Sequence, residues 1–121
     1  MSSGNGLIQY IVVRKDLIQK LQWPIGAVIA QACHACSAVM HIHSDDSATQ
    51  EYTSDLDNMH KCILEIESEE KLKNLAVKLE QNNIMHKVWV EQPENYPTCL
   101  ATKPCKKEDV QIYFKKLKLF K

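Results

Sequence analysis

A short apolar strand followed by a long helix of small residues is the feature that most restricts how this chain folds. Leu7 to Val13 reads LIQYIVV, and a short run so rich in β-branched and aromatic residues predicts a buried strand. Beyond Trp23, apolar residues recur at spacings of three and four, which predicts a helix of about five turns beginning at Pro24. Its glycine and alanines favour close packing on a sheet, so the two segments together predict an α/β domain.

The rest of the chain continues this alternation of strands and helices. Strands are expected at 62–66, 86–91 and 98–102, and helices between 68 and 82 and at 106–117, with a polar segment from 44 to 58 that holds a short helix at 49–56. The expected order is β-α-β-α-β-β-α, in which helices separate parallel strands and cover both faces of a four-stranded sheet. Residues 1–6 are expected to form a flexible tail before one domain at 7–121.

Charge and hydropathy exclude several classes of protein. The fifteen basic and fifteen acidic residues cancel, so any binding of nucleic acid must come from a local patch and not from net charge. The first six residues are polar and resemble no secretory signal. We expect no apolar segment as long as the roughly 20 residues that span a bilayer. We therefore expect a cytoplasmic protein with reduced cysteines and no membrane partner.

Cys33 and Cys36 have the spacing of a redox or half-zinc motif. A redox pair normally lies at a helix N-terminus, where the dipole lowers the thiol pKa, but this pair lies two to three turns inside the predicted helix. A zinc site requires a second pair of ligands, which the sequence does not clearly supply. Two buried structural thiols are therefore the main interpretation, with a redox role as the alternative and no metal expected.

Polar residues on the predicted long helix and at strand ends are the candidates for a site. Gln31 and His34 are three residues apart and project onto one helical face, although a lone helical histidine is equally a packed or solvated residue. Glu91 ends a predicted strand, a suitable place for a general base or an ordinary loop carboxylate. Cations follow the first and fourth strands, where they either gather into a phosphate-binding patch or remain solvated: Arg14, Lys15, Lys103, Lys106 and Lys107.

These residues lie within motifs of a known family. The sequence Val12-Val13-Arg14-Lys15-Asp16-Leu17, followed by Gly26 and by Ala30-Gln31-x-x-His34-Ala35, resembles the class-two peptidyl-tRNA hydrolases. Thr98-x-Leu100-x-x-x-Pro104 matches a further motif of that family, and the resemblance extends from about residue 7 to 121. The Glu91–Asn95 segment and the C-terminal Lys-Leu-Phe-Lys resemble, more narrowly, the divergent peptidyl-tRNA hydrolase domain-containing proteins of eukaryotes.

This resemblance implies a fold, a reaction and a set of site residues. The implied fold is a three-layer α/β/α sandwich with a mixed four-stranded sheet. The implied reaction is hydrolysis of the ester between peptide and tRNA in translation quality control, without a cofactor, and with a homodimer left open. The implied catalytic residues are Gln31, His34, Glu91 and Thr98, and the implied tRNA-binding residues are Arg14, Lys15, Lys103, Lys106 and Lys107.

The sequence departs from the family at two positions of the implied site. Ala27 stands where the family has a lysine after the helix glycine, and Glu91 stands where the family has an aspartate. Two functions therefore stay open. The first is hydrolysis, with Lys15 or Lys103 replacing the missing lysine. The second is binding of tRNA, another RNA or a protein without turnover.

Overall fold

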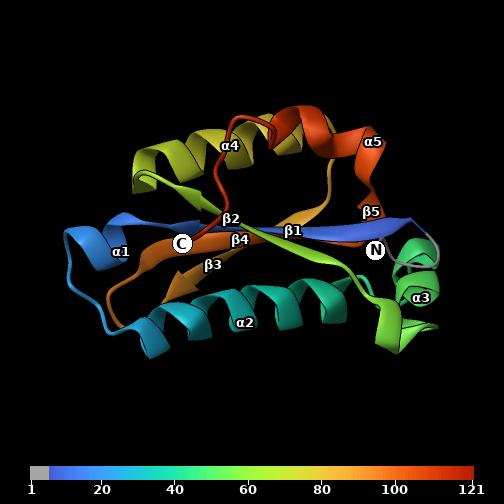
Figure 1. Cartoon of the computed structure of the whole chain (residues 1–121), viewed down its shortest axis with the longest axis horizontal. Helices are drawn as coiled ribbons and strands as arrows, with labels where there is room; N and C mark the ends of the chain where they lie inside the picture. Colours follow the sequence, from blue (N-terminus) through green and yellow to red (C-terminus); the bar gives the residue numbers. More distant parts are fainter. Residues whose placement is uncertain (1–5) are drawn as a thin grey trace.

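The middle layer of the fold is a mixed sheet with its strands in the order β2-β1-β4-β3 (Figure 1). The computed structural model describes residues 6–121. Its strands are β1 (Leu7–Arg14), β2 (Lys61–Ile66), β3 (His86–Glu91), β4 (Tyr96–Thr102) and a short β5 (Cys105–Lys106). β1 pairs in parallel with β2 and antiparallel with β4, and β4 is antiparallel to β3. The expected mixed four-stranded sheet is confirmed, with β5 added beside the start of β1.

Helices cover both faces of this sheet, as the α/β/α sandwich requires. α2 (Ile25–Ile42) lies on one face, and α4 (Glu69–Gln81) and α5 (Lys107–Val110) lie on the other (Figure 1). Alternate residues of β1 enter different cores: Tyr10 and Val12 pack with Leu72 of α4, whereas Ile11 and Val13 pack on the side of α2. Because β1 is buried on both faces, its sequence is apolar at most positions and does not alternate between apolar and polar residues.

Short helices fill the connections that the sequence left irregular or unassigned. α1 (Asp16–Gln19) follows β1 directly, and a 3-10 turn (Leu56–Asn58) precedes β2. α3 (Ser47–Thr53) begins earlier than the expected helix at 49–56, because the Asp46 side chain accepts a hydrogen bond from the Thr49 backbone and caps the helix there. These elements make the observed order longer than the one expected. Residues 1–5, most of the expected tail, lie outside the described residues.

The expected C-terminal helix at 106–117 is wrong. The chain forms only α5 and a 3-10 turn (Gln111–Tyr113), and then runs back along the outer edge of β2. There the Glu65 N–H donates to the Lys118 carbonyl at 2.9 Å, and the Phe120 N–H donates to the Ile63 carbonyl at 3.0 Å. An edge strand presents unpaired backbone groups, and the last residues satisfy them, which a continued helix would prevent.

α2 is also an exception to the expectation that no apolar run approaches membrane-spanning length. It has 18 residues and, by length and composition only, is apolar enough to cross a bilayer; it is the one such helix among residues 6–121. A core helix meets the same criterion. In the structure α2 is one layer of the sandwich, with Val28, Gln31, Ala35 and Val39 buried against the sheet.

Candidate active site

Gln31 is buried at the contact between α2 and β4. Its side chain lies in the middle of α2, where the Nε2 donates to the Ala27 carbonyl at 3.1 Å. The Thr98 hydroxyl donates to the Gln31 Oε1 at 2.8 Å, and both residues are almost fully buried. Both polar ends of the carboxamide therefore have partners, which fixes its orientation in the absence of any ligand.

A bulge between β3 and β4 brings Thr98 to this contact. Trp89 pairs with Cys99 and the next residue, Val90, pairs with Pro97, so Thr98 is the extra residue of β4. A bulge of this kind changes the direction of a side chain. Consequently, consecutive residues both reach α2: Thr98 donates to the Gln31 side chain, and the Cys99 thiol donates to the Gln31 carbonyl at 3.0 Å. Burial raises the pKa of Cys99 to about 12, so this thiol stays protonated.

Trp89 connects the other two expected catalytic residues. The exposed imidazole of His34 stacks on the Trp89 ring with centroids 4.6 Å apart and planes at 17°. The Trp89 Nε1 donates to the Glu91 Oε1 at 3.1 Å. One indole thus orients a histidine from α2 and a carboxylate from the end of β3.

The structure therefore brings all four expected catalytic residues to one side of α2. Gln31 and Thr98 form its buried part, and His34 and Glu91 form its accessible part around Trp89. Trp89 was not among the site residues expected from the sequence. Its position could have indicated it, because Trp89 and Glu91 are two residues apart in one strand and so project from the same face.

The buried Gln31–Thr98 contact has a measurable energy. Replacing Thr98 by valine removes the donor and leaves a buried carboxamide oxygen unpaired, so we expect the free energy of unfolding to fall by about 2 kcal/mol. Adding Gln31→Leu to Thr98→Val should recover part of that loss, with an interaction energy of about 1 kcal/mol in urea denaturation. Thr53→Val on the exposed side of α3 is the matched control and should change stability by less than about 0.5 kcal/mol. Additive single losses would contradict the coupling.

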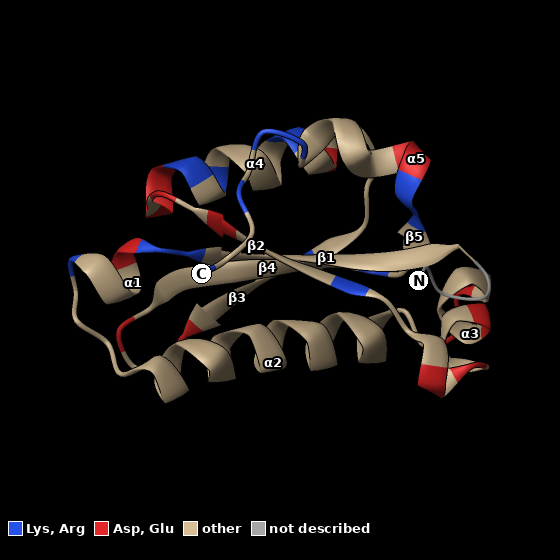
Figure 2. Cartoon of the chain, in the orientation of Figure 1, with Lys and Arg blue, Asp and Glu red and all other residues tan. Residues whose placement is uncertain are grey.

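The expected cations do not gather at one edge of the sheet. Arg14 ends β1, whereas Lys106 pairs with Leu7 at the beginning of β1. At a rise of about 3.3 Å per residue these two ends are about 23 Å apart. The expectation of a single patch is therefore wrong, because β4 runs antiparallel to β1 and carries the lysines that follow it to the opposite end (Figure 2).

Individual cations at these two ends have partners of their own. Arg14 is buried beside Asp16, and Lys15 lies 3.8 Å from a Glu65 carboxylate oxygen and 4.4 Å from the centre of the Phe120 ring. At the other end Lys103 donates to the Asp46 carboxylate at 2.9 Å, and Lys106 and Lys107 are exposed. No ion pair or hydrogen bond within residues 6–121 joins Lys15 or Lys103 to Gln31, His34, Glu91 or Thr98. The tRNA-binding roles of these residues remain predictions.

The Asp46–Lys103 pair predicts a pH dependence. The hydrogen bond from Lys103 holds the pKa of Asp46 below its ordinary value, and Asp46 also caps α3. We expect Asp46→Ala to lower the free energy of unfolding by about 1 kcal/mol at neutral pH, and Asp46→Asn to cost less because asparagine also caps. The folded-state pKa is lowered, so this stabilisation is present above the ordinary pKa of about 3.9 and is lost as pH falls through the lowered value. Urea denaturation should therefore show wild type and Asp46→Ala converging in acid; a constant difference would contradict the assignment.

The cysteine pair on α2 is only half buried. Cys36 is partly covered and its thiol donates to the Gln9 Oε1 at 3.4 Å, but Cys33 is exposed, so the interpretation of two buried thiols is wrong for Cys33. The reason is the helix register, since α2 turns Cys33 away from the sheet-facing stripe. Within residues 6–121, no three His, Cys, Asp or Glu side chains are grouped to hold a metal ion.

Fold and site together define an α/β/α protein in which a glutamine, a histidine and a carboxylate lie between the long helix α2 and one edge of the sheet. Comparison with known proteins agrees with that class: a family model described as peptidyl-tRNA hydrolase PTH2 matches residues 7–120. The chain belongs to this family. It is also 51% identical over 116 residues to proteins of Mus musculus and Homo sapiens, each named "Putative peptidyl-tRNA hydrolase PTRHD1". Each alignment covers 95% of this chain and 83% of the relative.

Proposed function

We propose that the protein hydrolyses the ester bond of peptidyl-tRNA in the cytoplasm, with His34 and Glu91 at the reacting centre. The observation that carries this proposal is the arrangement around Trp89, where one indole holds an exposed imidazole and a carboxylate on the same side of α2. Membership of the PTH2 family supports the choice of substrate.

In the proposed reaction His34 acts as the general base, because an imidazole nitrogen is the group that most often accepts a proton in catalysis. His34 takes a proton from a water molecule as the water oxygen attacks the ester carbonyl carbon. The bond between that carbon and the ribose oxygen then breaks, and the proton passes from His34 to the leaving ribose oxygen, which becomes a hydroxyl. Glu91, with one carboxylate oxygen held by Trp89, uses the other to orient the water.

Gln31 and Thr98 are positioning residues in this proposal. Their side chains are buried and bonded to each other, so they set where α2 lies relative to β4 and do not reach the solvent-facing part of the site. That placement matters because His34 is on α2 and Glu91 is on β3. An error of about 1 Å between such groups can lower a rate roughly 100-fold.

The direct test is incubation of purified protein with a peptidyl-tRNA and measurement of free tRNA. Release that depends on His34 supports the proposal. An intact substrate, under conditions where an active PTH2 enzyme cleaves it, would overturn the proposal. Filter binding of the same labelled tRNA at low and high salt should accompany the assay, because phosphate contacts weaken steeply with salt.

The placement of the lysines favours a second function, which is binding of tRNA without turnover. Position 27 precedes Gln31 by one turn of α2, and Ala27 provides only its backbone carbonyl there. The two lysines expected to replace the family lysine are engaged with Glu65 and Asp46. Salt-sensitive binding of tRNA with no hydrolysis is the result that selects this second function.

Replacing Ala27 by lysine is expected to increase the hydrolysis rate. Ala27 and His34 are seven residues apart and share a helical face, so a lysine at position 27 adds a cation beside the proposed reacting centre. One positioned donor to a developing oxyanion contributes roughly 100-fold or more in kcat. Single-turnover hydrolysis measures the effect, and Ile29→Lys, exposed on the opposite flank of the same helix, is the control for added charge. Equal rates for wild type and both variants would show that the missing lysine does not limit this protein.

A further inference from the structure

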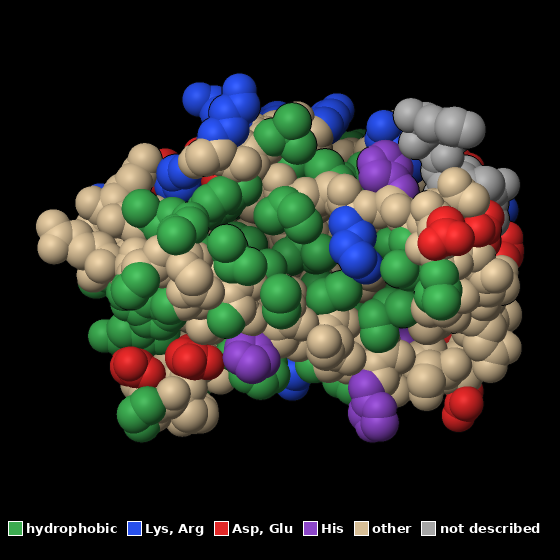
Figure 3. Space-filling model, turned by 60° about the horizontal axis from the view of Figure 1, so that its bottom comes forward, with side chains coloured by type: hydrophobic (Ala, Val, Ile, Leu, Met, Phe, Trp, Pro, Cys, Tyr) green, Lys and Arg blue, Asp and Glu red, His purple; other side chains and the backbone are tan. Residues whose placement is uncertain are grey.

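An apolar groove lies on the other flank of α2, between this helix and strands β1 and β2. The groove forms because α2 packs against β4, β3 and β1 and leaves this face of the edge strand β2 without a covering helix. The groove has a volume of about 450 Å³, within the range of small-molecule sites. Figure 3 shows apolar side chains gathered across this face of the molecule.

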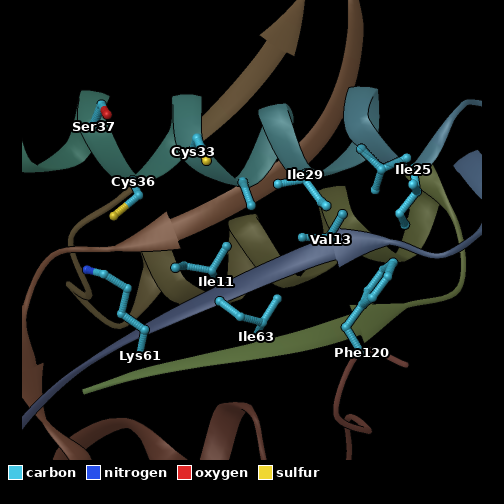
Figure 4. A pocket seen from close by; sticks show the side chains of 12 residues that line it. Ile11, Val13, Ile25, Ile29, Cys33, Cys36, Ser37, Lys61, Ile63 and Phe120 are labelled. Atoms are coloured by element: carbon cyan, nitrogen blue, oxygen red, sulfur yellow. The ribbon is translucent and has the colours of Figure 1, made fainter. Parts of the chain in front are cut away.

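The walls of the groove are almost entirely apolar. Ile11 and Val13 of β1 and Ile63 of β2 form one side, and the other side comes from α2 (Figure 4). Ile25 and Ile29 of α2 line it and are more than half exposed. An apolar ligand that binds in a concave site removes side chains of this kind from water, and this burial lowers the free energy of the complex.

Of the described residues that line the groove, Lys61 is the one cation, and it lies at one end with Phe120 at the other (Figure 4). The Lys61 ammonium donates to the Gln9 Oε1, lies 3.4 Å from the Tyr52 hydroxyl and is 5.2 Å from the centre of the Tyr52 ring. Gln9 is fully buried and its Nε2 donates to the Thr102 carbonyl, so it is a fixed acceptor.

These partners hold Lys61 in place but leave its charge unpaired. Gln9 is neutral, and burial raises the pKa of Tyr52 to about 12, so the tyrosine is neutral too. None of the ion pairs found within residues 6–121 includes Lys61. An ammonium has three donor hydrogens, and the two oxygen partners leave one for a ligand.

The groove is separate from the candidate active site. Cys33 and Cys36 line the groove, whereas His34 faces Trp89 of β3 across the opposite flank of the same helix. β3 and β2 are the two ends of the four-strand path, so α2 itself stands between the two sites.

We propose that this groove binds an aliphatic carboxylate. The chain of the ligand lies along the apolar walls between α2 and strands β1 and β2, and its carboxylate pairs with the Lys61 ammonium. An unpaired cation at the end of an otherwise apolar groove selects an anion at one end of an apolar molecule, because neither a neutral hydrocarbon nor a highly charged polyanion matches both parts. This inference does not depend on the proposed hydrolase activity.

Isothermal titration of the purified protein with dodecanoate tests the proposal. We expect saturable one-to-one binding to wild type, and a loss of affinity of roughly tenfold or more in Lys61→Met, which keeps the apolar stem and removes the charge. Lys78→Met on α4 is the matched control and should bind as wild type does. Dodecanol has the same chain without a carboxylate, so its affinity should not differ between wild type and Lys61→Met.

A second measurement locates the ligand and guards against a folding defect. Cys33 is exposed and lines the groove, whereas Cys62 belongs to the core on the side of α4. Dodecanoate should therefore slow alkylation of Cys33, read by mass spectrometry, and leave Cys62 unaffected. Cys33→Trp, which fills the groove from an exposed position, should abolish binding with an unchanged circular dichroism spectrum.

Three results would overturn the proposal. The first is no saturable binding to wild type, and the second is equal affinity in wild type and Lys61→Met. The third is a dimer in analytical ultracentrifugation that Cys33→Trp dissociates, with no protection of Cys33 by dodecanoate, because a second copy of the chain would then cover the groove.

Discussion

Replacing Arg14 by methionine is expected to lower the free energy of unfolding by about 3 kcal/mol. The Arg14 guanidinium makes a two-pronged contact with the Asp16 carboxylate, at 2.9 Å for each nitrogen–oxygen pair. It also donates to the Pro97 carbonyl at 2.9 Å and lies 3.5 Å from Glu69 at the start of α4. Removing it leaves Asp16, only 14% exposed, without its cation. Urea denaturation followed by circular dichroism measures the loss.

Lys71→Met is the matched control for this prediction. Lys71 also pairs with a carboxylate at 2.9 Å, that of Glu67, but the two side chains are 56% and 72% exposed. Water screens such a pair, so its loss should leave the free energy of unfolding almost unchanged. If the two variants lose equal stability, the network around Arg14 does not hold β1, α4 and the start of β4 together as inferred.

Replacing His34 by alanine is expected to lower kcat for peptidyl-tRNA hydrolysis by at least about 100-fold, the smaller end of the usual contribution of a general base. The imidazole is exposed, so its removal should leave the fold intact. Single-turnover hydrolysis measures the effect, and the pH profile of kcat/KM provides a second readout. In His34→Ala the profile should lose the rise with pH that a general base produces, a change that a merely structural role would not produce.

Two variants make this prediction specific to the site. His41→Ala changes an exposed histidine two turns later on α2 and should leave the rate unchanged. Trp89→Phe keeps an aromatic face for His34 but removes the indole donor to Glu91, so its rate should fall while the His34-dependent pH profile stays. A rate that survives in His34→Ala would assign the base to Glu91 or would show that this site performs no hydrolysis.

The local elements were predictable because their causes lie in neighbouring residues. Six apolar residues, interrupted by one glutamine, make up most of β1. The spacing of three and four makes α2, and the Ser68 side chain caps α4 as its sequence position indicates. The sequence motif also named Gln31, His34, Glu91 and Thr98, and the structure brings these four together.

The C-terminal segment shows where such reasoning stops. Residues 106–117 have a helical pattern. The helix ends early because Lys118 and Phe120 form backbone hydrogen bonds with the edge strand β2. The partner of those groups is more than 50 residues away in the sequence, so periodicity within the segment carries no information about it.

The sequence by itself determined the class of fold and the family, and its motifs suggested four residues of the candidate site, since strand and helix patterns and short motifs are properties of adjacent positions. Only the tertiary structure decided how these parts face each other. The antiparallel direction of β4 separates Arg14 from Lys106, the bulge beside Trp89 turns Thr98 toward Gln31, and the offset of α2 leaves β2 uncovered. Each of these depends on pairing and packing between distant segments, where sheet order and backbone hydrogen bonds set the geometry.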